Sequence, residues 1–82
     1  MKKVKSLPEM NIIGANIKEA RQQAKLSQQL LSERLELLGI YICRGSISRI
    51  ERGKRAVTDI EIDGIAKILN VSPNELFQWP GN

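Results

Sequence analysis

The chain has 82 residues, enough for one domain with a small core, and its 13 Lys and Arg against 9 Asp and Glu give a net charge of +4. One cysteine and no histidine exclude an internal disulfide and argue against zinc, haem or histidine-dependent catalysis. No apolar run is long enough to cross a bilayer, so we expect a cytoplasmic protein that binds no metal or cofactor, enters no membrane and is not an enzyme.

The sequence predicts a basic N-terminal tail over residues 1–9, one domain over residues 10–79 and a short C-terminal tail over residues 80–82. Positive charge is concentrated early in the chain, because Lys67 is the only basic residue after Arg55. This asymmetry indicates one surface suited to a polyanion. For the N-terminal tail we favour a mobile, disordered end, and the competing interpretation is a basic arm along a phosphate backbone.

The first helix is predicted to begin between Pro8 and Ile13. Its cap is either the pair Ser6 and Glu9, which have capping-box spacing, or Asn11. Apolar side chains at helical spacing then mark the buried face, namely Ile13, Ile17, Ala20 and Ala24.

Arg21 lies beside this apolar stripe, and a charge in that place favours a buried or half-buried ion pair. A turn at residues 25–26 leads to Ser27, which is the predicted N-cap of the second helix. The first-turn amides of that helix have no partner within it and suit a phosphate. Its apolar side faces inward with Leu30, Leu31 and Leu35.

The segment between the second and third helices has a strand-like composition, but no partner strand is predicted. Gly39 is the expected C′ residue that stops the second helix. We therefore predict an extended connection that buries either Ile40 or Ile42. Cys43 follows as a poor N-cap, and we expect it to be a small, partly buried filler and not a reactive thiol.

The stretch CRGSISRIERGKR, residues 43–55, carries the strongest functional signal. Ile47 and Ile50 lie three residues apart and anchor one face of a short helix, which Gly53 stops. The remaining surface is cationic, through Arg44, Arg49, Arg52, Lys54 and Arg55. Such a helix fits the major groove of DNA, although a solvated surface helix is the competing interpretation for this stretch alone.

Two further helices follow, each with a capping signature. Thr58 and Glu61 form a capping box, and Ser72 and Glu75 form another. Asn70 is the expected left-handed end of the fourth helix. The inward face of that helix consists of Ile62, Ile65, Ala66 and Leu69. The sequence therefore predicts an all-α fold of five short helices, in which the second and third form a helix-turn-helix.

Three segments, GANIKEARQQAKLSQ, SISRIERGKR and IAKILNVSPNELF, together resemble the phage-repressor and Cro-like (XRE) family of helix-turn-helix regulators. The resemblance covers about residues 12–79. It implies a compact five-helix, lambda-repressor-like domain that binds double-stranded DNA sequence-specifically as a transcriptional regulator. The recognition helix, about residues 44–51, would lie in the major groove. The alternative is an antitoxin or protein-interaction module that uses the same basic face.

The resemblance also assigns roles to individual residues. Arg21 and Glu51 match a pair that forms an internal salt bridge in the family. The residues expected to contact bases are Arg44, Gly45, Ser48 and Arg49, and we place most of the specificity on the two arginines. The residues expected to contact phosphates are Ser27, Gln28, Ser46, Arg52, Lys54 and Arg55.

Two departures and one possible interface complete the expectations. Lys25 stands where the family usually has glycine, which predicts either strain at that turn or a turn of different form, and the connection over residues 36–42 is longer than usual. A homodimer on a palindromic site would use the C-terminal helix through Leu76, Phe77 and Trp79. In the competing interpretation Leu76 and Phe77 cap the core and only Trp79 is exposed.

Overall fold

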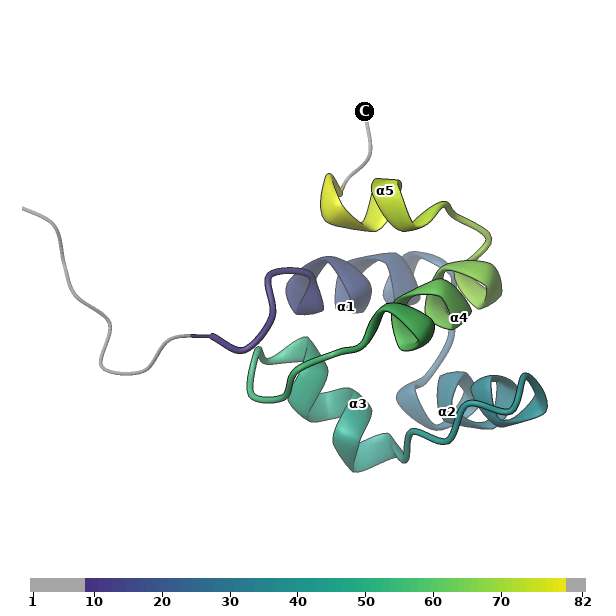
Figure 1. Cartoon of the computed structure of the whole chain (residues 1–82). Helices are drawn as coiled ribbons and strands as arrows, with labels where there is room; N and C mark the ends of the chain where they lie inside the picture. The colour runs from purple at the N-terminus through teal and green to yellow at the C-terminus, as the bar shows by residue number, and fades with distance from the viewer. Residues whose placement is uncertain (1–8, 80–82) are drawn as a thin grey trace, which may run out of the picture.

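Five helices follow one another along residues 9–79, the part of the chain that the computed structural model describes (Figure 1). They are α1 (Gly14–Gln23), α2 (Gln28–Leu37), α3 (Arg44–Glu51), α4 (Asp59–Leu69) and α5 (Pro73–Phe77). No strand occurs in these residues, and the predicted all-α, five-helix fold is confirmed. The two predicted tails fall outside the described residues, except for Glu9.

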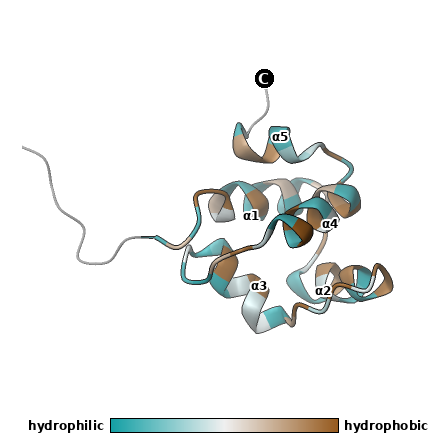
Figure 2. Cartoon of the chain, viewed as in Figure 1, coloured by the Kyte–Doolittle hydropathy of each residue, from teal (hydrophilic) through white to brown (hydrophobic). Residues whose placement is uncertain are grey.

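The helices form three levels. α1 and α4 lie between α5 on one side and the pair α2 and α3 on the other (Figure 1). In Figure 2 each helix carries both brown and teal residues, as expected of helices with one buried and one wet side. The arrangement leaves α3 at the edge of the domain, packed against α1 and α2 only along its inner side. No helix of the described chain is long and apolar enough to span a membrane.

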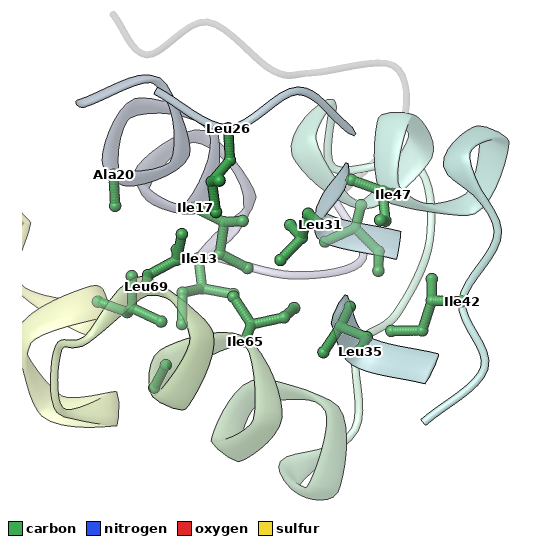
Figure 3. Packing of buried hydrophobic residues seen from close by; sticks show 13 residues of the cluster. Ile13, Ile17, Ala20, Leu26, Leu31, Leu35, Ile42, Ile47, Ile65 and Leu69 are labelled. Carbon is green, nitrogen blue, oxygen red and sulfur yellow. The ribbon is translucent and has the colours of Figure 1, made fainter. Parts of the chain in front are cut away.

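The core draws on every helix and on both connections that flank α2. The side chains point toward one another in the middle of the domain (Figure 3). They belong to Ile13, Ile17, Ala20, Leu26, Leu31, Leu35, Ile42, Ile47, Ile50, Ile65, Ala66, Leu69 and Leu76. Ile42 is buried and Ile40 is partly buried against the core, so both isoleucines of the predicted extended connection contact the core. Gly64 gives Ile40 room, because a Cβ on Gly64 would collide with the Ile40 Cδ1 methyl.

Local capping signals place the helix ends of α4 and α5 as predicted. Thr58 and Glu61 form a reciprocal capping box at α4, and Ser72 and Glu75 form the same arrangement at α5. Asn70 ends α4 in the left-handed conformation, with a φ of 60°.

The start of α1 differs from the prediction. The helix begins at Gly14, and its N-cap residue Ile13 offers no side-chain cap. Asn11 supplies the acceptor instead, because its Oδ1 receives hydrogen bonds from the amides of Gly14 at 2.6 Å and Ile13 at 3.1 Å. The predicted box of Ser6 and Glu9 is wrong as a cap for this helix, which starts several residues later, and Ser6 itself lies outside the described residues.

The turns on either side of α2 use left-handed backbone. Lys25 has a φ of 61°, which is the strain predicted for a residue where the family has glycine. Gly39 has a φ of 81° and stops the helix as expected. Ala24, predicted on the buried face of α1, is exposed because it lies at the C-cap, just past the end of the helix.

The three residues predicted to form a dimer face at the C-terminal helix α5 differ in exposure from that prediction. Leu76 has an exposed fraction of 0%, and it belongs to the core. Phe77 is 47% exposed, whereas Trp79 is partly buried and packs against the core. Leu76 is therefore unavailable to a partner. The competing interpretation is confirmed for Leu76 and wrong for the other two residues, because Phe77 and not Trp79 has the more exposed side chain.

Candidate DNA-binding surface

α3 has a buried side and an exposed, cationic side. Ile47 and Ile50 are each 1% exposed and point into the core. At about 100° per residue, Gly45, Arg49 and Arg52 fall on the opposite side of the helix. The exposed residues of α3 and its C-cap are Arg44, Gly45, Arg49 and Arg52, and Ser48 is half-buried beside them.

A buried ion pair joins α3 to α1. Arg21 Nε donates to Glu51 Oε2 at 2.7 Å and its second terminal nitrogen donates to Glu51 Oε1 at 3.0 Å, with side-chain exposures of 9% and 2%. Arg21 also donates to the carbonyl of Leu26 at 2.8 Å. The negative charge of the Glu51 carboxylate is thereby balanced by Arg21, and the carboxylate points inward. It therefore adds no negative charge to the outer side of α3.

The predicted phosphate contacts at the start of α2 already have partners within the protein. Ser27 Oγ accepts a hydrogen bond from the amide of Leu30 at 3.0 Å and caps the helix, as predicted. The side-chain amide of Gln28 donates to Glu51 Oε1 at 3.0 Å. Gln28 therefore lies against the buried ion pair, between α2 and the end of α3.

Near the start of α3, the hydroxyl of Ser46 contacts the side chains of two other residues. One terminal nitrogen of Arg49 donates to Ser46 Oγ at 2.9 Å, and Cys43 Sγ lies 3.4 Å from the same oxygen. The hydrogen bond with Ser46 lowers the pKa of the Cys43 thiol. Cys43 occupies the N-cap position without a side-chain cap, as expected, but it is exposed and not the partly buried filler that we predicted.

The three cations at the end of α3 and in the turn that follows differ in their exposure to solvent. Arg52 and Lys54 are exposed. Arg55 is half-buried, and its two terminal nitrogens donate to the carboxylate oxygens of Glu61 at 3.1 Å each. This pairing raises the pKa of Arg55 and lowers that of Glu61. Arg55 was predicted to contact phosphate, and in this structure its guanidinium is instead held by Glu61.

One contributor to this surface was recognised in the sequence only as a helix cap. Besides capping α1, Asn11 donates its side-chain amide to the carbonyls of Ile50 at 3.0 Å and Arg55 at 2.8 Å. The amide of Met10 donates to the carbonyl of Gly53 at 2.9 Å. These partners lie about forty residues further along the chain, so a local sequence signal cannot reveal them.

The comparisons with known proteins agree with this geometry. The pattern of the helix-turn-helix family matches residues 17–76, most of the chain. This chain belongs to the helix-turn-helix family of DNA-binding transcriptional regulators. No curated protein is similar enough in sequence to count as a match.

Two solved structures are similar to this helix-turn-helix protein. The restriction-modification controller protein C.AhdI from Aeromonas hydrophila has 32% sequence identity and a TM-score of 0.69, over 79% of this chain and 87% of that one. The clp gene regulator ClgR from Corynebacterium glutamicum shares the fold, with 20% identity and a TM-score of 0.74, over 87% of this chain and 73% of that one. Both of these similar proteins are regulators.

Within the helix-turn-helix unit, α2 and α3 are the two helices and residues 38–43 connect them. The connection was predicted over residues 36–42, and it begins later because α2 continues to Leu37. Ser32 Oγ donates to the carbonyl of Ile42 at 2.6 Å and ties this connection back to α2. The longer turn is therefore held near its end by this hydrogen bond and by burial of Ile42.

Proposed function

We propose that this regulator binds double-stranded DNA sequence-specifically, with α3 in the major groove. The observation that supports this most directly is the division of α3 into two sides. Ile47 and Ile50 are 1% exposed, whereas Arg49 is exposed on the opposite side and Arg44 is exposed at the first position of the helix. A helix fixed in this way presents guanidinium groups that match the acceptors on guanine edges.

In this proposal Arg44 and Arg49 contact bases, and Ser48 lies beside them. Each good bidentate arginine contact discriminates by about 1–3 kcal/mol against the wrong base. Arg49 must leave its hydrogen bond to Ser46 to reach a base, which releases the Ser46 hydroxyl toward a phosphate. The two side chains would therefore change partners together on binding.

Gly45 supports the same assignment, because the structure has room for a larger side chain at this position. A Cβ at this position would lie 3.9 Å from an Arg49 nitrogen, an ordinary contact. No contact within residues 9–79 requires glycine at this position, so we propose that close approach to DNA requires it. Gly45→Ala should then raise the stability by about 0.5–1 kcal/mol while it weakens DNA binding. A variant that gains stability and binds as well as the wild type would contradict this role.

The phosphate contacts in the proposal follow the edges of α2 and α3. They come from Ser27, Gln28, Ser46, Arg52, Lys54 and Arg55. Arg55 would have to exchange Glu61 for a phosphate, so we expect it to contribute less than Lys54. Of these residues only Arg52, Lys54 and Arg55 are cationic, so with three phosphates neutralised per subunit the logarithm of the affinity should fall with the logarithm of salt at a slope of about −3.

The decisive experiment is selection from a random duplex pool followed by sequencing. We expect a defined, guanine-containing site, and a fluorescence anisotropy titration on that site gives the affinity and its salt slope. Arg49→Ala should relax the base preference, and the matched variant Lys54→Ala should weaken all sequences alike. No enrichment, together with a flat salt response, would overturn the proposal in favour of a protein-interaction module or antitoxin.

We also propose a homodimer on a palindromic site, with α5 near the interface. Phe77 is 47% exposed on α5, which lies on the far side of the domain from α3 (Figure 1). Dimerisation there leaves α3 uncovered. Sedimentation should show dimers that Phe77→Lys dissociates, and wild-type monomers at micromolar concentration would contradict it.

The remaining expectations follow from the same assignment. We propose a cytoplasmic location, where DNA is accessible to such a regulator. We propose no catalytic activity, cofactor or metal, and the described residues hold no cluster of ligands for a metal ion.

A further inference from the structure

The side chain of Asn11 makes four hydrogen bonds. Its Oδ1 accepts from the amides of Ile13 and Gly14 at the start of α1. Its Nδ2 donates to the carbonyls of Ile50 and Arg55 at 3.0 and 2.8 Å. A side-chain amide has two N–H donors and one oxygen with two lone pairs, so the capacity of Asn11 is filled. One side chain thus joins the start of α1 to both ends of the turn that follows α3.

Neighbouring residues complete this joint. The amide of Met10 donates to the carbonyl of Gly53 at 2.9 Å. Gly14 lies so close to α3 that a Cβ there would collide with the carbonyl of Ile50. The side chain of Glu9 lies about 3.3 Å from the position that a Cβ on Gly53 would occupy. We call residues 9–14 the clasp, and residues 50–55 the turn that it holds.

The held turn carries the two exposed cations, Arg52 and Lys54. Carbonyls at the end of a helix have no partner in the next turn and usually bond to water or to a cap. Here the clasp supplies donors to the carbonyls of residues 50, 53 and 55. The backbone on both sides of Arg52 and Lys54 is therefore fixed relative to α1, and with it the direction in which these side chains leave the domain.

We propose that Asn11 is a positioning residue for DNA binding, which holds the turn so that Arg52 and Lys54 meet phosphates while α3 lies in the groove. The inference rests on the proposed function. It adds a residue that contacts no DNA and acts through the backbone of the turn. Its loss should weaken phosphate contacts without changing which bases are read, because Ile47 and Ile50 still fix α3, and with it Arg44 and Arg49, to the core.

The first test compares Asn11→Ala with Asn16→Ala by anisotropy on the selected duplex at several salt concentrations. Asn16 is a matched control, since it is a half-buried asparagine that donates to a backbone carbonyl, that of Leu76, at 2.7 Å. For Asn11→Ala we expect a salt slope less steep by about 1–2, the equivalent of one or two lost phosphate contacts, with an unchanged base preference. Asn16→Ala should keep the wild-type slope.

The outcomes separate the two proposals. A loss of stability alone lowers the active fraction and leaves the slope unchanged. If the wild type binds and Asn11→Ala keeps its slope, the role of Asn11 is overturned and the proposed function stands. If the wild type shows no duplex-dependent signal, the proposed function fails and the role of Asn11 falls with it.

A second variant tests the geometry without DNA. Asn11→Asp has the same shape and keeps the acceptor that caps α1, but it has no donor for Ile50 and Arg55 at neutral pH. We expect faster hydrogen exchange at the amide of Lys54, which donates to the carbonyl of Arg49 at 2.8 Å, while the amides of α1 keep wild-type protection. Unchanged exchange at Lys54 would overturn the inference. A general loss of protection would overturn it as well, because Asn11 would then only stabilise the fold as a whole.

Discussion

Replacing Glu51 with glutamine removes the charge from the buried ion pair and keeps the shape of the side chain. Arg21 is then left as an uncompensated cation with a side-chain exposure of 9%. Breaking a buried pair by removing one partner costs about 3–5 kcal/mol. A chain of 82 residues has a total stability of about 4–12 kcal/mol. We therefore expect Glu51→Gln to remove a large part of the stability, and to lower the urea midpoint without changing the slope of the transition.

The double variant Arg21→Met with Glu51→Met distinguishes the penalty of a lone charge from the value of the pair. Without either charge, the desolvation penalty disappears on both sides. Two smaller losses remain. The carbonyl of Leu26 loses its hydrogen bond from Arg21, and the side-chain amide of Gln28 loses its hydrogen bond to Glu51. We expect the double variant to be less destabilised than Glu51→Gln alone.

Urea unfolding followed by circular dichroism and by the fluorescence of the partly buried Trp79 gives the free energies of unfolding of the wild type, Glu51→Gln, the double variant, and its single variants Arg21→Met and Glu51→Met. A cost below about 1 kcal/mol for Glu51→Gln would refute the reasoning, because that is the range of exposed pairs. A double variant as unstable as the sum of its single variants would refute it as well, since independent sites add.

Three other substitutions test separate features of the fold. Lys25→Gly should raise the stability by up to about 1 kcal/mol, because the φ of 61° costs a lysine more than glycine loses in chain entropy; thermal unfolding measures it. Gly14→Ala should destabilise by about 1–3 kcal/mol, since the added Cβ meets the rigid carbonyl of Ile50; an unchanged melting temperature would contradict that collision. Pairing with Arg55 lowers the pKa of Glu61, so its stabilisation is complete above the ordinary value of about 4.3 and is lost as pH falls through the lowered pKa. Acid titrations should show a steeper loss of stability for the wild type than for Glu61→Gln, and parallel curves would exclude this source.

Local signals predicted the helices whose ends are set by neighbouring residues. The capping boxes at Thr58 and Ser72 lie within four residues of the groups that they satisfy, so their chemistry is visible in the sequence. The buried sides of α3 and α4 followed from helical spacing, through the two isoleucines of α3 and a longer apolar series in α4. The strain at Lys25 was also visible, through the contrast with the glycine usual in the family.

What the sequence could not decide depended on partners far along the chain or on helices too short for a pattern. α5 has only five residues, so its periodicity could not tell that Leu76 is in the core and Phe77 outside. Arg55 was assigned to phosphate by its place in the basic turn. Its partner Glu61 had already been given another role, as the capping residue of Thr58, and the same carboxylate serves both. A charge census along the sequence counts such a cation as available when the fold has paired it.

The length of α3 explains why its inner contacts matter so much to its outer ones. A helix of eight residues is too short to be stable alone in water, so its shape and direction come from what holds it. Ile47 and Ile50 fix it to the core, Glu51 fixes its end to α1, and Asn11 fixes the turn beyond. Every one of these contacts lies on the inner side or past the last residue. The exposed side chains of α3 take no part in these contacts, so substitutions among them should alter the DNA sequence that is bound while leaving the fold intact.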